Sequence, residues 1–138
     1  MVFAFVTIAV LVLIGLLHVY WAMGGRMGIT VAIPEFEGRS LFRPGPLVTF
    51  TVALLLFFAA VIVAVQAGMI FHEKFGLVPR AATIVLAMVF AARAIGDFQY
   101  VGFFKRVTET RFARLDTLCY SPLCVLLPLG LAVTASHR

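Results

Sequence analysis

The sequence predicts an all-α integral membrane protein, a bundle of four transmembrane helices, on three observations. Four long apolar blocks fill most of the 138 residues, charged residues make up only 12% of the chain, and the mean hydropathy is +1.11. An α-helix needs ~20 apolar residues to cross ~30 Å of hydrocarbon, and each block is near that length. Because the blocks lack the alternation of barrel strands, we expect the spans to be helices.

The four blocks belong to a single predicted domain that covers residues 1–138. No stretch has the polar, low-complexity composition of a linker. The expected spans lie at about residues 2–23, 47–71, 79–96 and 117–136.

The first span begins at the second residue, which is also where a signal peptide would lie. It has no basic n-region, and it is longer than an h-region of 7–15 residues, so we expect a retained helix. Tyr20 and Trp21 lie near its end, and such aromatic residues favour the membrane–water boundary. The chain is therefore expected to leave the bilayer near Gly24.

The two long connections have different compositions. Residues 24–46 mix β-branched residues with glycine and proline, which predicts a short hairpin or a re-entrant segment. The run at residues 43–46 favours an extended approach to the second helix. Residues 97–116 combine aromatic and basic side chains, which is typical of an interfacial segment among lipid headgroups.

Orientation follows from the basic residues in the connections. The first and third connections carry seven: Arg26, Arg39, Arg43, Lys105, Arg106, Arg111 and Arg114. The opposite side carries three: Lys74, Arg80 and Arg138. Basic residues favour the cytoplasmic side, so we expect both termini outside, with inverted or dual topology left open. This bias also explains the net charge of +5 without a nucleic-acid partner.

Polar side chains from all four spans are expected at one depth, in the cytoplasmic half. At a rise of ~1.5 Å per residue, His18, Thr51, Arg93 and Tyr120 lie roughly 6–8 Å inside the ends of their spans. We predict that this layer is a ligand-binding site under the two long connections. Its candidate residues are His18, Trp21, Thr51, Arg93, Asp97, Tyr100 and Tyr120.

Arg93 and Asp97 are four residues apart and are predicted to pair on one helical face. A charge at bilayer depth indicates a functional site, but the same pair could simply tie down the end of the third helix. Asp116 is predicted to cap the N-terminus of the fourth helix. Pro122 is assigned a structural role near the start of that helix.

Metal, cofactor and redox chemistry find little support. His18, His72 and His137 fall at different levels or sides, and Cys119 and Cys124 do not have zinc spacing, so we expect no metal and no cofactor. The two cysteines could form a labile disulfide. Quinone-linked disulfide-generating enzymes also have four helices, but they relay electrons between two cysteine pairs, and this chain has one.

Several remaining residues have packing interpretations. Gly15, Gly68 and Gly130 are expected to permit close helix packing, and Pro128 to kink the fourth helix. Gln66 is polar but isolated near the outer end of the second helix.

Five sequence runs carry a resemblance to a known family. They are residues 18–25, 41–46, 93–105, 114–116 and 120–124. Over nearly the whole chain they resemble a bacterial family of small four-span membrane proteins known only as a domain of unknown function. The resemblance implies a location in the bacterial inner membrane and no particular activity.

Three functional hypotheses remain. The favoured one is binding of a lipid-, quinone- or isoprenoid-like amphipathic molecule, with Arg93 on its polar head. The second is an intramembrane proton-transferring enzyme that resembles the sterol-isomerase-like family, with His18, Asp97 and Asp116 as the acid–base set. The first two spans carry no Asp or Glu, which departs from that family's pattern.

The third hypothesis is a small dimeric transporter or an accessory subunit of a larger membrane complex. The expected partners are therefore membrane lipids, an amphipathic ligand, and a second copy or a larger complex. Whether the chain is an enzyme stays open.

Overall fold

The computed structural model describes residues 1–71 and 77–136 and contains four long helical segments. All four are long and apolar enough to cross a membrane, which confirms the predicted class. They are α1 (Val2–Ala22), α3 (Pro46–Gln66), α4 (Leu77–Ile95) and the continuous series α5 (Arg111–Leu115), η1 (Asp116–Tyr120) and α6 (Ser121–Ser136).

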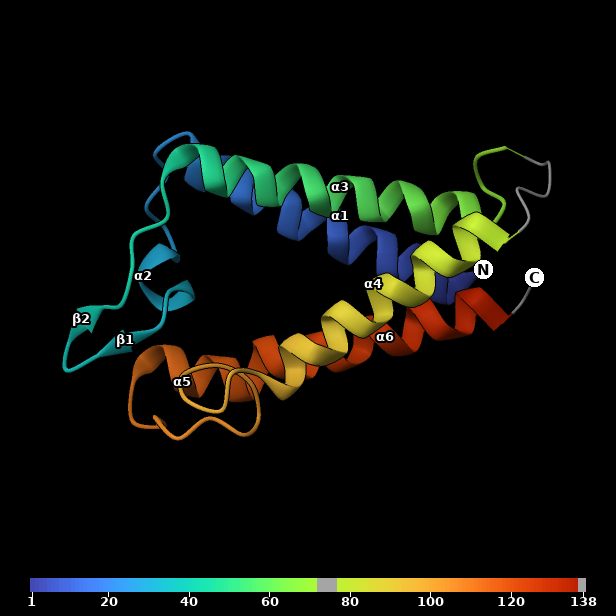
Figure 1. Ribbon diagram of the computed structural model, residues 1–138. Helices are drawn as coiled ribbons and strands as arrows, with labels where there is room; N and C mark the ends of the chain where they lie inside the picture. The colour runs from blue at the N-terminus through green and yellow to red at the C-terminus, as the bar shows by residue number, and fades with distance from the viewer. Residues whose placement is uncertain (72–76, 137–138) are drawn as a thin grey trace.

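The long helices form two pairs, α1 with α3 and α4 with α6 (Figure 1). The pairs converge at the end of the bundle that holds both termini and diverge toward the end that holds α2, the strands and α5 (Figure 1). The buried core lies between the helices and consists of Ala4, Leu11, Ala59, Ala60, Val63, Leu127 and Leu131. Large apolar side chains elsewhere on the four helices stay exposed, as expected for surfaces that face lipid.

Small residues set how closely the helices approach. A methyl group at Gly15 would lie 2.6 Å from Cε1 of Phe57 on α3. At Gly130 a methyl group would collide with the Thr7 hydroxyl of α1. The predicted packing role of these two glycines is therefore confirmed, as in other membrane bundles.

Gly68 has a different role from the predicted one. Its φ of +71° follows the end of α3, which stops at Gln66 instead of continuing to Phe71. A glycine in the left-handed region ends a helix without strain, because it has no Cβ. The second span is thus shorter at this end than the hydropathy suggested.

The first long connection contains the predicted hairpin. A short helix, α2 (Ile29–Ala32), precedes two antiparallel strands, β1 (Glu35–Phe36) and β2 (Arg39–Ser40). Between the strands, Glu37 and Gly38 have φ of +51° and +76°, the left-handed pair that a two-residue hairpin turn requires. The chain then enters α3 through extended Gly45 and Pro46 at the first helical position, also as predicted.

The fourth helical segment begins six residues earlier than predicted, and Asp116 is not its N-cap. Thr110 caps it instead, because its Oγ1 accepts the backbone N–H of Ala113 at 3.0 Å. Asp116 begins η1, a π-helical turn that joins α5 to α6. Pro122 lacks an N–H and cannot donate to the carbonyl of Leu118, so it accounts for the widened turn just before it.

Candidate functional site

The carboxylate of Asp116 lies at the centre of a buried polar cluster. Its side chain is fully buried. Oδ1 accepts a hydrogen bond from Arg93 Nη2 at 3.0 Å. Oδ2 accepts from the Gly102 amide at 2.8 Å, from Lys105 Nζ at 3.1 Å and from Ser121 Oγ at 3.2 Å. A carboxylate with two cations and two neutral donors around it can stay ionised in a low-dielectric setting.

Lys105 is committed to this cluster and faces inward. Its side chain is only 2% exposed. Nζ donates to Asp116 Oδ2, to the carbonyl of Gly102 at 2.9 Å and to Thr117 Oγ1 at 2.6 Å. An ammonium group has three protons, so all of its donors are used.

Arg93 is the partly accessible member of the cluster. Its side chain is 35% exposed, while its Nη1 is covered and has no hydrogen-bond partner in residues 1–71 and 77–136. Arg93 and Lys105 carry two positive charges against the one negative charge of Asp116. The cluster therefore keeps one net positive charge and an unused donor at the end of α4.

Two glycines shape the loop that delivers the Gly102 amide to Asp116. Gly96 and Gly102 both have φ of +89°, and a Cβ on either would collide with the backbone of the other segment. Phe103 donates its N–H to the carbonyl of Ala94 at 2.9 Å, which closes the loop onto the last turn of α4. Only glycine tolerates this combination of conformation and contact.

Asp97 stabilises the same loop and does not pair with Arg93, so the predicted pair is wrong. Its Oδ1 accepts the backbone N–H groups of Gln99, Tyr100 and Val101 at 2.9, 2.7 and 2.9 Å. Because α4 ends at Ile95, residues 93 and 97 do not share a helical face. Partial burial would raise the pKa of Asp97, but the three amides outweigh it and hold the pKa below its usual value of 3.8.

Two of the predicted residues lie together on α1. His18 Nδ1 is 2.8 Å from the carbonyl of Ile14, and its ring meets the ring of Trp21 edge-on at 5.1 Å. Trp21 Nε1 donates to the carbonyl of Met27 at 2.8 Å. The polar atoms of this pair are therefore hydrogen-bonded within α1 and to the start of the first connection.

The other predicted residues make hydrogen bonds outside the Asp116 cluster. Tyr120 donates its hydroxyl to the carbonyl of Val31 at 3.2 Å, which holds α2 against the bundle. Tyr100 Oη accepts from Gln99 Nε2, and its ring packs against Phe36 of the hairpin. Thr51 is exposed on α3 and bonds to its own helix at the carbonyl of Leu47, so it is not brought to the cluster.

Lys105 and the Gly102 amide are the members that the sequence interpretation missed. Lys105 stands among aromatic and basic residues, where it counted toward topology instead of a site. The only available signal was the pair of glycines, six residues apart, that frames the loop. Arg93 forms its ion pair with Asp116, and not with Asp97 as predicted.

The carboxylates of the hypothetical acid–base set have other hydrogen-bond partners than His18. Asp97 and Asp116 are both occupied by donors, and no contact joins either of them to His18 within the described residues. The thiols of Cys119 and Cys124 are free. No group of three His, Cys, Asp or Glu side chains could hold a metal in the described part of the chain, and His72 and His137 lie outside it.

Two cavities are lined by residues outside the predicted layer. One, of about 470 Å³, separates the first connection from α5 and is lined by Thr30, Val31, Glu35, Gly38, Glu109, Thr110 and Arg111. The other, of about 420 Å³, lies between α1, α3 and α6 at the end that holds the termini. The seven residues of the predicted ligand-binding layer line neither of these two cavities.

Comparison with the sequence models of known families identifies a family for the chain. The sequence model of the family described as "Protein of unknown function (DUF3995)" matches residues 11–132, which is most of the chain. No curated protein and no solved structure matches the chain.

Proposed function

We propose that the chain, which belongs to the DUF3995 family of unknown function, binds the anionic head of an amphipathic molecule at Arg93. The tail of that molecule, of the lipid or isoprenoid type, would lie along the apolar helix surfaces. The observation that carries the proposal is the surplus positive charge of the cluster, which lies on an arginine whose side chain is one-third exposed. The charge of a guanidinium group is delocalised over the whole group, so its exposed part can attract carboxylate or phosphate oxygens.

The surroundings of the cluster support an interfacial headgroup. Phe98, Phe103 and Phe104 of the glycine-framed loop are exposed, and Phe98 and Phe104 pack against each other. Arg106 and Arg114 are exposed in the same connection and in α5. Exposed aromatics with arginines beside them fit a surface that sits among headgroups.

For orientation, we propose that the long connections face the cytoplasm of a bacterial cell. The support is the excess of basic residues in these connections. A background without Cys119 and Cys124 allows single cysteines to be tested. Ile70→Cys should react with an impermeant maleimide in intact spheroplasts, and Ser40→Cys only after permeabilisation. The reverse pattern would invert the proposed topology.

The binding proposal is tested by native mass spectrometry of gently extracted protein, followed by identification of what stays bound. An anionic amphiphile should remain at one per chain, and Arg93→Gln should lose it. Arg106→Gln is the control, because it removes an exposed arginine from the same connection. Equal retention by both variants would mean that Arg93 serves only to hold Asp116.

A further inference from the structure

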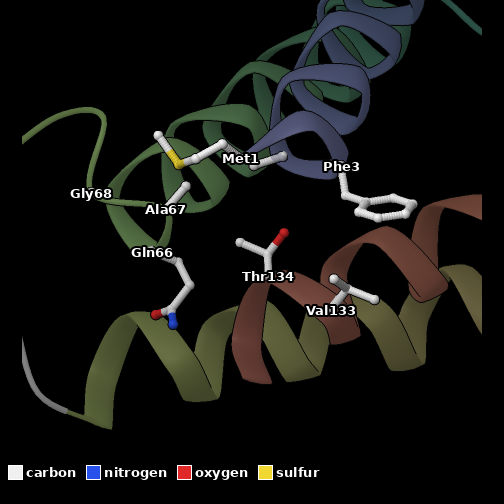
Figure 2. Close-up of a pocket in the computed structure, with 8 residues that line it drawn as sticks. Met1, Phe3, Gln66, Ala67, Gly68, Val133 and Thr134 are labelled. Carbon is white, nitrogen blue, oxygen red and sulfur yellow. The ribbon is translucent and has the colours of Figure 1, made fainter. Parts of the chain in front are cut away.

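The cavity between the first connection and α5, here called the α5 cavity, is lined by charged side chains of both signs. Its volume of about 470 Å³ falls in the range of small-molecule sites. Glu35 of β1 lines it from the first connection, and Glu109 and Arg111 line it from the other side. Figure 2 shows the cavity at the opposite end of the bundle, which is lined chiefly by apolar side chains. The charged lining therefore distinguishes the α5 cavity.

Contacts between distant parts of the chain hold the two walls of the α5 cavity in place. Arg111 donates its backbone N–H to Glu35 Oε1 at 3.3 Å. Tyr120 donates its hydroxyl to the carbonyl of Val31, which is itself a lining residue. Both contacts join the first connection to the fourth helical segment. The cavity is therefore a feature of the tertiary fold and not a gap within one loop.

The charges around the α5 cavity do not neutralise one another. The two ion pairs found in residues 1–71 and 77–136 both involve Asp116, so Glu35, Glu109 and Arg111 form none among themselves. Glu35 is half-buried, while Glu109 and Arg111 are exposed. Two carboxylates and one guanidinium group are therefore available to a ligand in the same cavity.

This set of charges selects a ligand that carries both signs. A simple anion would meet two carboxylates, and a simple cation would meet the guanidinium group of Arg111. A zwitterion can place an ammonium group on the carboxylates and an anionic group on the guanidinium. A metal ion fits less well, because the described residues contain no group of three His, Cys, Asp or Glu side chains that could hold one.

The lining also indicates which kind of ammonium group would bind. A primary ammonium group has three N–H donors for carboxylate oxygens, whereas a quaternary one has none. Quaternary ammonium groups are recognised by aromatic rings, and none of the lining residues described for the α5 cavity is aromatic. The cavity therefore favours a primary ammonium group.

We propose that the α5 cavity binds a zwitterion with a primary ammonium group and an anionic group. The ammonium group would pair with Glu35 and Glu109, and the anionic group with Arg111. Both groups occur together in the head of phosphatidylethanolamine and in free compounds such as glycerophosphoethanolamine. Arg93 is not a lining residue, so this proposal does not depend on the function proposed above.

The test uses the full chain in phosphatidylcholine nanodiscs that contain a phosphatidylethanolamine probe with a photoreactive group near its glycerol. Labelled peptides are mapped by mass spectrometry, and the probe should label residues 30–38 and 109–111 saturably. Glu109→Gln and Arg111→Gln should each weaken its apparent affinity by about fivefold, the upper limit for the loss of one exposed ion pair. Both variants keep the hydrogen bond from the backbone N–H of residue 111 to Glu35, which excludes the loss of that contact as the cause.

Matched controls remove the same charges outside the cavity. Glu37→Gln changes an exposed carboxylate of the same hairpin, and Arg114→Gln changes an exposed arginine of α5. Neither residue lines the cavity, so both variants should label like the parent chain. Competitors identify the source of the zwitterion. Competition by glycerophosphoethanolamine in the buffer would show that the free compound binds, and competition by unlabelled phosphatidylethanolamine alone would assign the site to a membrane lipid.

Three results would overturn the proposal. The first is equal apparent affinity of the probe for the parent chain and for the Glu109→Gln and Arg111→Gln variants. The second is labelling of the cavity that does not saturate in the phosphatidylcholine matrix. The third is equal competition by phosphatidic acid, which has the phosphate but no ammonium group.

Discussion

Replacement of Lys105 by methionine tests whether the Asp116 cluster holds the molecule together. Methionine keeps an unbranched side chain in the same buried space but removes the ammonium group. Asp116 then loses one of its two cations, and Gly102 O and Thr117 Oγ1 each lose a donor. Breaking a buried ion pair costs about 3–5 kcal/mol, but Arg93 still pairs with Asp116. We therefore expect Lys105→Met to lower the free energy of unfolding by an amount near the lower limit, about 3 kcal/mol.

The assay is unfolding in mixed micelles by titration with sodium dodecyl sulfate, followed by the fluorescence of Trp21, the single tryptophan of the chain. Arg106→Met is the matched control, because Arg106 is exposed, and it should change stability by less than about 0.5 kcal/mol. In an Asp116→Asn background the cost of Lys105→Met should fall by more than about 1 kcal/mol, since the two residues are coupled. If Lys105→Met costs no more than Arg106→Met, the cluster is not a stabilising unit.

Three further predictions concern the loop and the connections. Gly102→Ala should lower the free energy of unfolding by more than about 2 kcal/mol in the same titration. Gly24 has φ of +94° but open space around it, so Gly24→Ala should lower it by only about 1 kcal/mol. Equal effects of the two substitutions would exclude the backbone collision as the cause. The pKa of Asp97 is lowered, so its stabilisation of the loop should be complete above its usual pKa of 3.8 and should disappear as the pH falls through the lower, folded-state pKa. Hydrogen exchange of the amides at residues 99–101 should show this loss in the parent chain and not in the Asp97→Asn variant; an identical acid profile in both would assign the effect to another group. Tyr120→Phe removes the hydrogen bond to the carbonyl of Val31, so it should lower the free energy of unfolding by about 0.5–1.5 kcal/mol. It should also increase protease cleavage within residues 29–36. Unchanged cleavage would mean that other contacts hold α2 in place.

Only some members of the Asp116 cluster could be predicted from the sequence. A lone arginine at bilayer depth marks a position that needs an explanation, and Arg93 is part of the cluster around Asp116. Its partner was misassigned, because Asp97 is the nearest carboxylate at helical spacing and helix α4 was expected to continue to it. The helix ends at Ile95, and the real partner, Asp116, is 23 residues away in the chain. Local spacing contains no information on a contact at that separation.

Lys105 and Gln66 also show that the sequence alone does not predict the environment of a polar side chain. Lys105 has the surroundings of an interfacial residue in the sequence, yet the folded loop turns its ammonium group into the cluster. Gln66 is isolated in the sequence, and the packing of α1 and α6 beside α3 makes it a lining residue of a cavity. In both cases a remote segment sets the environment of the side chain.

The class of this protein was determined by the sequence alone, because the bilayer imposes a local rule. A segment of about 20 apolar residues must satisfy its backbone internally, so the four spans and their helical form follow from composition. The hairpin between residues 35 and 40 and the extended entry into α3 were also local, since they depend on glycine and proline conformation. Only the tertiary structure decided which charges meet and which polar groups stay unpaired. Those properties depend on the path of the loop between Gly96 and Gly102 and on how the helix pairs converge, and both arise from contacts between residues far apart in the chain.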